Sequence, residues 1–281
     1  MGAGVDEDVV RGPWSVVRGP ILYPREPATS IGLLLLQDMA ARFYAPDLNP
    51  SEQVARLPAD EARHLVKVLR LAPGAIVGVF DGRGHEWRAR VETAGREGVE
   101  VSLLEPVPAQ RPAVDITLVQ AVLKGEPMDS VVRDCTMVGI VALQPVLTAR
   151  TTVKTSVTLA APERWRRIAL ASAKQCGAAR LPAIGEVMTF EAWLQHAPVQ
   201  SAFILVEPSA AVAPVKMRQL ASGPVPSHAT LIVGPEGGWT AEERDRAIAA
   251  GCSPVSLGPM TLRADAVALA ATAILCAMWD E

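Results

Sequence analysis

"GPEGGWTAEE" (residues 234–243) follows directly on the apolar segment "ATLIV" (229–233), so a buried strand gives way here to a glycine-rich loop. Pro235 biases the residue before it towards an extended conformation, which gives the chain a defined exit from the strand. Gly237 and Gly238 can adopt positive φ angles and let a ligand contact the backbone. The stretch therefore predicts a shaped cradle at the end of a strand.

The same stretch predicts where the next helix begins. Thr240 and Glu243 have the T-x-x-E spacing of a capping box, which satisfies free N–H groups at a helix start. We therefore expect a helix over 241–250 that ends before Gly251.

The side chains of the loop limit its ligand. The loop carries Glu236 but neither Lys nor Arg, and no G-x-x-x-x-G-K-[ST] or G-x-G-x-x-G signature follows a strand in the chain. A polyphosphate is therefore disfavoured, and a cationic or zwitterionic ligand is favoured. Taken alone, the loop is also explained by an ordinary tight turn.

A second stretch repeats the design. "VSLGPMTLRADA" (255–266) again joins an apolar strand, a Gly-Pro exit at Gly258-Pro259 and an apolar helix. Ligands of parallel sheets collect at the carboxyl ends of the strands. Two successive exits of this kind can therefore form the two sides of one pocket.

The sequence around both loops alternates apolar strands with helices. We expect strands at 115–123, 140–148, 201–207, 229–233 and 254–258, and helices near 128–137, 162–177, 241–250 and 264–279. Continuous apolar strands that alternate with helices predict an α/β fold, in which a mostly parallel sheet has helices on both faces.

The N-terminal part of the chain has another organisation. Residues 1–38 lack periodicity and are rich in Pro, Gly and charge, so we expect a disordered extension, and we hypothesise that Met39 is the true start. One helix and several strands with a hairpin turn predict a small β-barrel-like domain over 39–105. The proline-rich segment 106–112 reads as a linker to a second domain, 113–281.

The helix of the small domain, expected over 58–71, carries a row of basic residues. Arg63, Lys67 and Arg70 have i, i+4, i+7 spacing, and His64 is adjacent. An ordinary solvated helix face explains such a stripe, and so does a surface that contacts RNA phosphates.

Composition excludes several classes of protein. The four cysteines form no CxxC pair, so neither a zinc site nor a disulfide framework is predicted. The leucine-rich run at 31–36 is too short to cross a bilayer, and we expect a soluble, cytoplasmic protein. The net charge of −3 disfavours nucleic acid, but Lys and Arg outnumber Asp and Glu within 41–90 and 120–180. An RNA partner is therefore expected on those two segments.

"LIVGPEGGWTAEE" followed by "LGPMTLR" resembles the RsmE family of RNA methyltransferases, which belongs to the SPOUT superfamily and has a C-terminal trefoil knot. The resemblance runs from Arg42 to the C-terminus. "RFYAPDL", "HLVKVLRLAPG" and "VFDGRGHEWRARV" are similar to the family's PUA-like RNA-binding domain, and "LKGEPMD", "QPVLTART", "ERWRRIALASAKQCG" and "RLP" follow in the family's order. The ordered set is specific, whereas each fragment alone is weak.

The resemblance implies a function and a cofactor. Family members methylate N3 of one uridine in 16S ribosomal RNA of the small subunit, work as homodimers, and use S-adenosylmethionine (SAM) and no metal. SAM carries a sulfonium and no phosphate, which agrees with a cradle that lacks basic residues. The implied cofactor contacts are Leu205, Gly234, Glu236, Gly237, Leu257 and Leu262. With the resemblance, the stripe on the 58–71 helix is interpreted as a phosphate contact, and Arg42, Lys124 and Arg150 match further family positions for RNA or site contacts.

The resemblance also indicates catalytic candidates. A guanidinium beside the uracil oxygens favours the uridine anion, and Arg263 is the candidate for this role. Glu236 and Asp265 are the carboxylates nearest in sequence to the proposed pocket, and either can accept the N3 proton. Solvent is a third possible acceptor. Each has a structural alternative: an ion pair for Arg263, bracing of the loop for Glu236, and stabilisation of a helix N-terminus for Asp265.

The chain departs from the family pattern near the presumed RNA side of the pocket. The departures are Ala264, Asp265 and Ala266 for Thr-Glu-Thr, Lys174-Gln175 and Ala178 for a Glu-Gln pair and an Arg, and Asp134 and Met137 for Lys and Glu. They favour an alternative, a non-catalytic RNA-binding or ribosome-assembly protein that kept the fold. A nucleotide-binding enzyme unrelated to methyl transfer is disfavoured, because phosphate signatures are missing.

Overall fold

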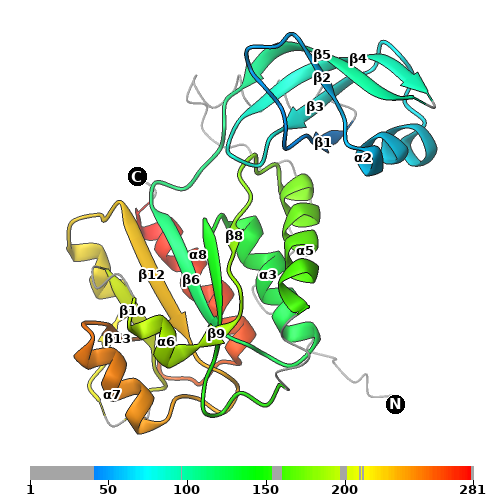
Figure 1. Cartoon of the computed structure of the whole chain (residues 1–281). Helices are drawn as coiled ribbons and strands as arrows, with labels where there is room; N and C mark the ends of the chain where they lie inside the picture. The colour runs from blue at the N-terminus through cyan, green and yellow to red at the C-terminus, as the bar shows by residue number, and fades with distance from the viewer. Residues whose placement is uncertain are drawn as a thin grey trace, which may run out of the picture.

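The computed structural model describes residues 41–279 except 96, 154–159, 197–200, 209 and 211. The expected extension, 1–38, and Met39 lie outside the described residues. The described chain forms two sheets (Figure 1). The strand order is β1-β3-β4-β5-β2 in the first sheet and β11-β13-β10-β12-β6-β7-β8 in the second, where β9 also pairs with β7.

The small N-terminal domain is β-rich, as the sequence predicts. Its elements are β1 (Arg42–Tyr44), β2 (Val54–Arg56), α2 (Ala59–Arg63), the π-helix η1 (His64–Leu69), β3 (Ile76–Phe80), β4 (Glu86–Gly95) and β5 (Gly98–Val107). Phe43, Leu65 and Val77 are fully buried in its core. β5 continues to Val107, two residues into the segment expected to be linker, because Val107 still pairs with Glu86 of β4.

The helix expected over 58–71 differs in its second half. After Arg63 the turns widen into η1, so positions four residues apart no longer share one face. Leu69, expected on the apolar side, is 38% exposed and Val68 is 64% exposed. Arg70 ends the helix in the left-handed conformation at φ 54°. The basic residues Arg63, His64, Lys67 and Arg70 are therefore all exposed, but they do not form the regular stripe that an α-helix would give.

The second sheet has the predicted α/β architecture, and all its pairings among described strands are parallel. Its elements are β6 (Asp115–Ala121), α3 (Glu126–Val138), β7 (Ala142–Leu147), α5 (Ala161–Cys176), β8 (Ala183–Ile184), β9 (Met188–Thr189), α6 (Phe190–Leu194), β10 (Ala202–Leu205), β11 (Val215–Lys216), η2 (Met217–Ser222), β12 (His228–Val233), α7 (Ala241–Ala249), β13 (Ser253–Ser256) and α8 (Ala264–Trp279). All five expected strands and four expected helices are present.

Helices cover both faces of this sheet. α3, α5 and α8 pack on one face, and α6 and α7 on the other. Leu231 and Ile232 are consecutive in β12 and point to opposite faces, yet both are fully buried. This double burial is why the strands read as continuous apolar runs. Within the described ranges, no helix is both long and apolar enough to cross a membrane.

The two domains meet at the C-terminal end of α5. The backbone N–H of Leu181 donates to the Gly82 carbonyl at 2.9 Å, and that of Gly84 donates to Ala179 at 3.1 Å. Gly82 has φ +76°, and a Cβ there would lie 2.9 Å from the Tyr44 ring. Burial raises the pKa of Asp81, but hydrogen bonds from His85 and Arg83 outweigh it and hold that pKa below its usual range. The turn between β3 and β4 is therefore held in shape for its hydrogen bonds with the segment that follows α5.

Candidate active site

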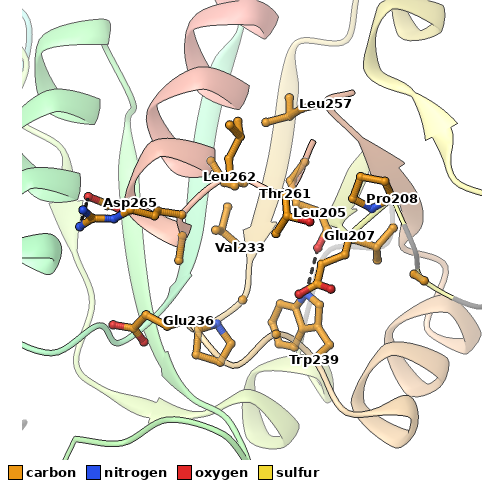
Figure 2. Close-up of a pocket in the computed structure, with 18 of the residues that line it drawn as sticks. Leu205, Glu207, Pro208, Val233, Glu236, Trp239, Leu257, Thr261, Leu262 and Asp265 are labelled. Carbon is orange, nitrogen blue, oxygen red and sulfur yellow. Dashed lines mark hydrogen bonds and ion pairs between the residues drawn. The ribbon is translucent and has the colours of Figure 1, made fainter. Parts of the chain in front are cut away.

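A cavity of about 600 Å³ opens at the carboxyl ends of β10, β12 and β13. Most of its wall comes from three segments: the end of β10, the glycine loop after β12 and the Gly-Pro exit after β13 (Figure 2). Leu123, Pro127 and Arg150 also line it. The structure thus brings the two predicted exits together around one space, and its volume is that of a site for a small molecule or cofactor.

Five of the six expected cofactor contacts line this cavity. They are Leu205, Gly234, Glu236, Leu257 and Leu262. Gly237 does not line it. Both Gly237 and Gly238 can adopt a positive φ, but only Gly238 does so in this turn, at 69°. The Gly237 carbonyl instead accepts a 2.7 Å hydrogen bond from Nη1 of Arg150.

Trp239 anchors the glycine loop, a role that the sequence reasoning missed. Its Nε1 donates to the carbonyl of Leu205 at 3.0 Å, which ties the loop to the end of β10 (Figure 2). A Cβ on Gly234 would lie 3.0 Å from the indole ring. The ring also contacts Phe190 with centroids 4.7 Å apart. A side chain at position 234 would therefore crowd the indole.

Glu207 is a second missed residue of the cavity wall. It follows β10 and its carboxylate lies close to the glycine loop, since a Cβ on Gly238 would be 2.9 Å from its Oε1. Leu205, two residues earlier, was an expected cofactor contact, but the Glu207 carboxylate was not singled out. A charged residue directly after a fully apolar strand was the available signal.

The predicted capping box is present and reaches further than expected. Thr240 accepts from the Glu243 N–H at 3.2 Å, and Glu243 accepts from the Thr240 N–H at 3.1 Å. The other carboxylate oxygen of Glu243 accepts from the N–H of Ala149 at 2.7 Å. The box therefore also fixes the loop that carries Arg150, which lines the cavity.

Arg263 and Asp265 both line the cavity and pair with each other. Nε and Nη2 of Arg263 each lie 3.2 Å from an Asp265 oxygen. The arginine side chain is 76% exposed and the aspartate 24%. The structural ion pair that the sequence left open is therefore present. So exposed a pair contributes little stability, and the guanidinium remains accessible from the cavity.

Glu236 lies on the same side of the cavity as Asp265 (Figure 2). One of its oxygens accepts a long, 3.4 Å hydrogen bond from the backbone N–H of Lys124, and its side chain is exposed. Lys124 is exposed beside it but does not line the cavity. If Glu236 braces the glycine loop, it does so through this one long hydrogen bond from Lys124.

The cavity carries both signs of charge. Three arginines, Arg150, Arg244 and Arg263, and three acids, Glu207, Glu236 and Asp265, line it. The expectation of a ligand cradle without basic residues therefore holds for the glycine loop but not for the whole cavity, because the three arginines come from other segments. No three His, Cys, Asp or Glu residues gather as a metal site in the part of the chain that the structure describes.

The basic residues expected to contact RNA lie in three places. Two of these residues, Lys124 and Arg150, lie beside or at the cavity. Arg63, His64, Lys67 and Arg70 are exposed on the small domain, whose α2 lies at the other end of the molecule from α7 and β13 (Figure 1). Arg42 is not available: its side chain is 10% exposed and binds Glu86 and carbonyls at the end of α5. This occupancy disfavours the expected RNA contact, and spacing along the sequence cannot show that a guanidinium is already occupied.

A parallel α/β sheet with a cofactor-sized cavity at its strand ends, joined to a small β-rich domain, is an architecture of RNA-modifying enzymes, and comparison with known proteins identifies the family. Residues 110–276 match the RNA methyltransferase domain, and residues 57–104 match the RNA methyltransferase PUA domain. Ribosomal RNA small subunit methyltransferase E from Synechocystis is 33% identical over 88% of this chain and 83% of that protein. The protein of that name from Mycobacterium tuberculosis is 31% identical over 86% of this chain and 94% of that protein. The chain belongs to this RNA methyltransferase family, the RsmE family.

Solved structures agree with this membership. The ribosomal RNA small subunit methyltransferase E of Neisseria gonorrhoeae, bound to S-adenosyl methionine, has a TM-score of 0.75 and is 29% identical, covering 85% of this chain and 98% of that one. The putative methyltransferase Lpg2936 of Legionella pneumophila, in complex with SAM, also has a TM-score of 0.75 and is 27% identical, covering 84% of this chain and 97% of that one.

Proposed function

We propose that this protein is a SAM-dependent methyltransferase that methylates N3 of one specific uridine in 16S ribosomal RNA. The observation that carries the proposal is the cavity between the two glycine-proline exits, in a chain whose relatives are named for methylation of small-subunit ribosomal RNA. The Neisseria relative is bound to SAM.

The residues of the cavity fit SAM. The cofactor carries a sulfonium, an ammonium and a carboxylate, and the wall offers three acids and three arginines. Gly238 has a positive φ, which disfavours any residue with a Cβ, and the Glu207 carboxylate lies beside it. We assign Leu205, Gly234, Glu236, Leu257 and Leu262 to cofactor contact, and Gly237 to the support of Arg150. When bound, SAM supplies an electrophilic methyl group.

Arg263 is proposed to stabilise negative charge on the uracil. The N3 nitrogen of uridine holds a proton at neutral pH and is a poor nucleophile. Each unit by which the site lowers its pKa corresponds to about 1.4 kcal/mol. An exposed guanidinium at the mouth of the cavity can leave Asp265 and turn to the uracil oxygens. Of the two carboxylates, Glu236 is the proposed proton acceptor, because its one contact is 3.4 Å long.

Further features of the family are proposals for this chain. They are the trefoil knot, a homodimer, cytoplasmic location, RNA contacts by Arg63, His64, Lys67, Arg70, Lys124 and Arg150, and the domain division at 39–105, 106–112 and 113–281. The exposed basic group on α2 and η1 supports the RNA contacts. The apolar α8 supports a role in dimer contact, although burial in the core accounts for much of its composition.

Methyl transfer from tritiated SAM to undermethylated small subunits tests the proposal. The expected product is one methylated uridine, located by mass spectrometry of the ribosomal RNA. Calorimetry with SAM separates the alternatives. SAM binding without any methylated RNA would favour the non-catalytic RNA-binding or assembly protein, and no SAM binding would exclude both the enzyme and the cofactor assignment.

A further inference from the structure

Arg42 of β1 joins the small domain to the C-terminal end of α5. Its Nε and Nη2 donate to the carboxylate of Glu86 at 2.8 and 2.7 Å. Its Nη1 donates to the carbonyl of Ala173 at 2.8 Å, and its Nη2 also donates to that of Ala178 at 3.2 Å. A cation beside the last carbonyls of a helix is favourable, because those groups carry partial negative charge. One shielded guanidinium therefore binds both domains.

A second charged pair crosses the same joint. Nζ of Lys174, in the last turn of α5, lies 2.9 and 2.7 Å from the two carboxylate oxygens of Glu61 in α2. The side chain of Glu61 is 6% exposed and that of Lys174 is 23% exposed. The ammonium also lies 5.7 Å from the centre of the Phe43 ring. Removal of one partner leaves the other charge poorly solvated, which is costly.

The joint between the domains lies at the amino ends of the strands, and the cavity lies at their carboxyl ends. Arg180, next to the joint, pairs with Asp115, the first residue of β6, whereas the cavity is at the carboxyl ends of the strands. A strand of seven residues spans about 23 Å. Over that length, a rotation of about 10° at the joint displaces a bound group by about 4 Å. Methyl transfer is sensitive to misplacements of about 1 Å, which can cost about 100-fold in rate.

We infer that Arg42 and Lys174 are positioning residues that fix the small domain against α5 and thereby set where RNA held by that domain meets the cavity. Neither residue lines the cavity, so they act through the orientation of the domain. The inference rests on the proposed function. It also accounts for Lys174, where the family pattern has an acid, because Lys174 finds a buried acid in Glu61.

Steady-state kinetics of the full-length protein test this role. Lys174→Gln removes the charge, and Lys174→Arg keeps it. With Lys174→Gln we expect KM for undermethylated small subunits to rise about tenfold and kcat to fall, because RNA held by the small domain is misplaced at the cavity. The Kd for SAM should stay at the wild-type value, because the cavity is not touched. Lys174→Arg should have a KM for small subunits close to the wild-type value. Arg42→Lys, which keeps the charge but loses the forked geometry, should resemble Lys174→Gln.

Arg246→Ala is the matched control, because it removes an exposed Arg–Glu pair within the second domain and should leave KM unchanged. Small-angle scattering of each variant measures the joint directly and should show a wider distribution of domain orientations for Lys174→Gln and Arg42→Lys. Unchanged scattering and unchanged KM in folded variants would overturn the inference. If the wild type transfers no methyl to RNA, the proposed function fails, and scattering alone then decides whether the two pairs fix the domains.

Discussion

Arg263 combines a position at the cavity with an exposed, weakly held side chain. Its partner, Asp265, holds it at 3.2 Å. Arg263→Gln should lower kcat about 100-fold or more, since one preorganised donor to a developing oxyanion contributes about that much. The Kd for SAM should change little. Measurement of kcat against pH is the sharper check: loss of the guanidinium should move the rising limb to higher pH, because the uridine anion then forms less readily.

Asp265→Asn separates the two roles of this pair. It frees Arg263 while it removes a carboxylate, so retained activity would identify Asp265 as a helix and ion-pair residue only. An Arg263→Gln variant with full kcat would remove Arg263 from the mechanism.

Trp239 is the residue whose single hydrogen bond links two walls of the cavity. Trp239→Phe keeps most of the ring and removes the bond to the Leu205 carbonyl. A neutral hydrogen bond contributes about 1 kcal/mol, so the Kd for SAM should rise about fivefold. Calorimetry measures this. Trp193→Phe is the control, since Trp193 is buried against Phe190 but does not line the cavity. Equal Kd values for the two variants would show that the anchor does not act on the cofactor.

At the scale of elements, the two strand exits shape the cavity. Gly238 has φ 69°, and a Cβ there would lie 2.9 Å from Oε1 of Glu207. Gly238→Ala should therefore destabilise the loop by about 1–2 kcal/mol, the cost of left-handed backbone for a residue with a Cβ, and should weaken SAM binding about tenfold or more. Calorimetry and thermal unfolding measure the two effects.

Gly223→Ala is the comparison for this substitution. Gly223 has φ −95°, and its nearest new contact would be 3.6 Å away, so the Kd for SAM should stay at the wild-type value. A normal Kd in Gly238→Ala would mean that the loop is not shaped for the cofactor.

Elements long enough to show a period were predicted well, and short ones were not. α3, α5, α7 and α8 begin and end within about two residues of the expectation, a usual margin for helix ends. β8, β9 and β11 have two residues each, too few for any alternation to appear. The π-helix η1 was missed because its turns differ in width from the 3.6-residue period that the reasoning assumed.

At the scale of the whole molecule, cofactor binding should stabilise the fold. The cavity joins three strand ends that are far apart in sequence, so a ligand there opposes unfolding of the second domain. At a SAM concentration of 100 times Kd, the gain is about 2.7 kcal/mol, which corresponds to a rise in Tm of about 5 °C or more. Differential scanning fluorimetry with SAM, and with ATP as a control, measures it. An equal shift with ATP would contradict the preference against polyphosphates.

The sequence by itself determined the α/β fold, the position of the cradle, the capping box and the family. All of these are local or ordered along the chain: glycine and proline restrict their own backbone, and burial on both faces makes a strand apolar throughout. The family resemblance supplied six expected cofactor contacts, and five of them line one cavity because strand ends of a parallel sheet meet at one edge.

Only the tertiary structure decided which charged groups are free. Arg42 and Lys174 are occupied at the joint, Arg150 and Arg244 enter the cavity wall, and Trp239 ties one strand end to another. Each of these facts depends on a partner from another segment of the chain. Spacing along a sequence gives a side chain's type and its face of an element, but not the distant group that desolvates or binds it.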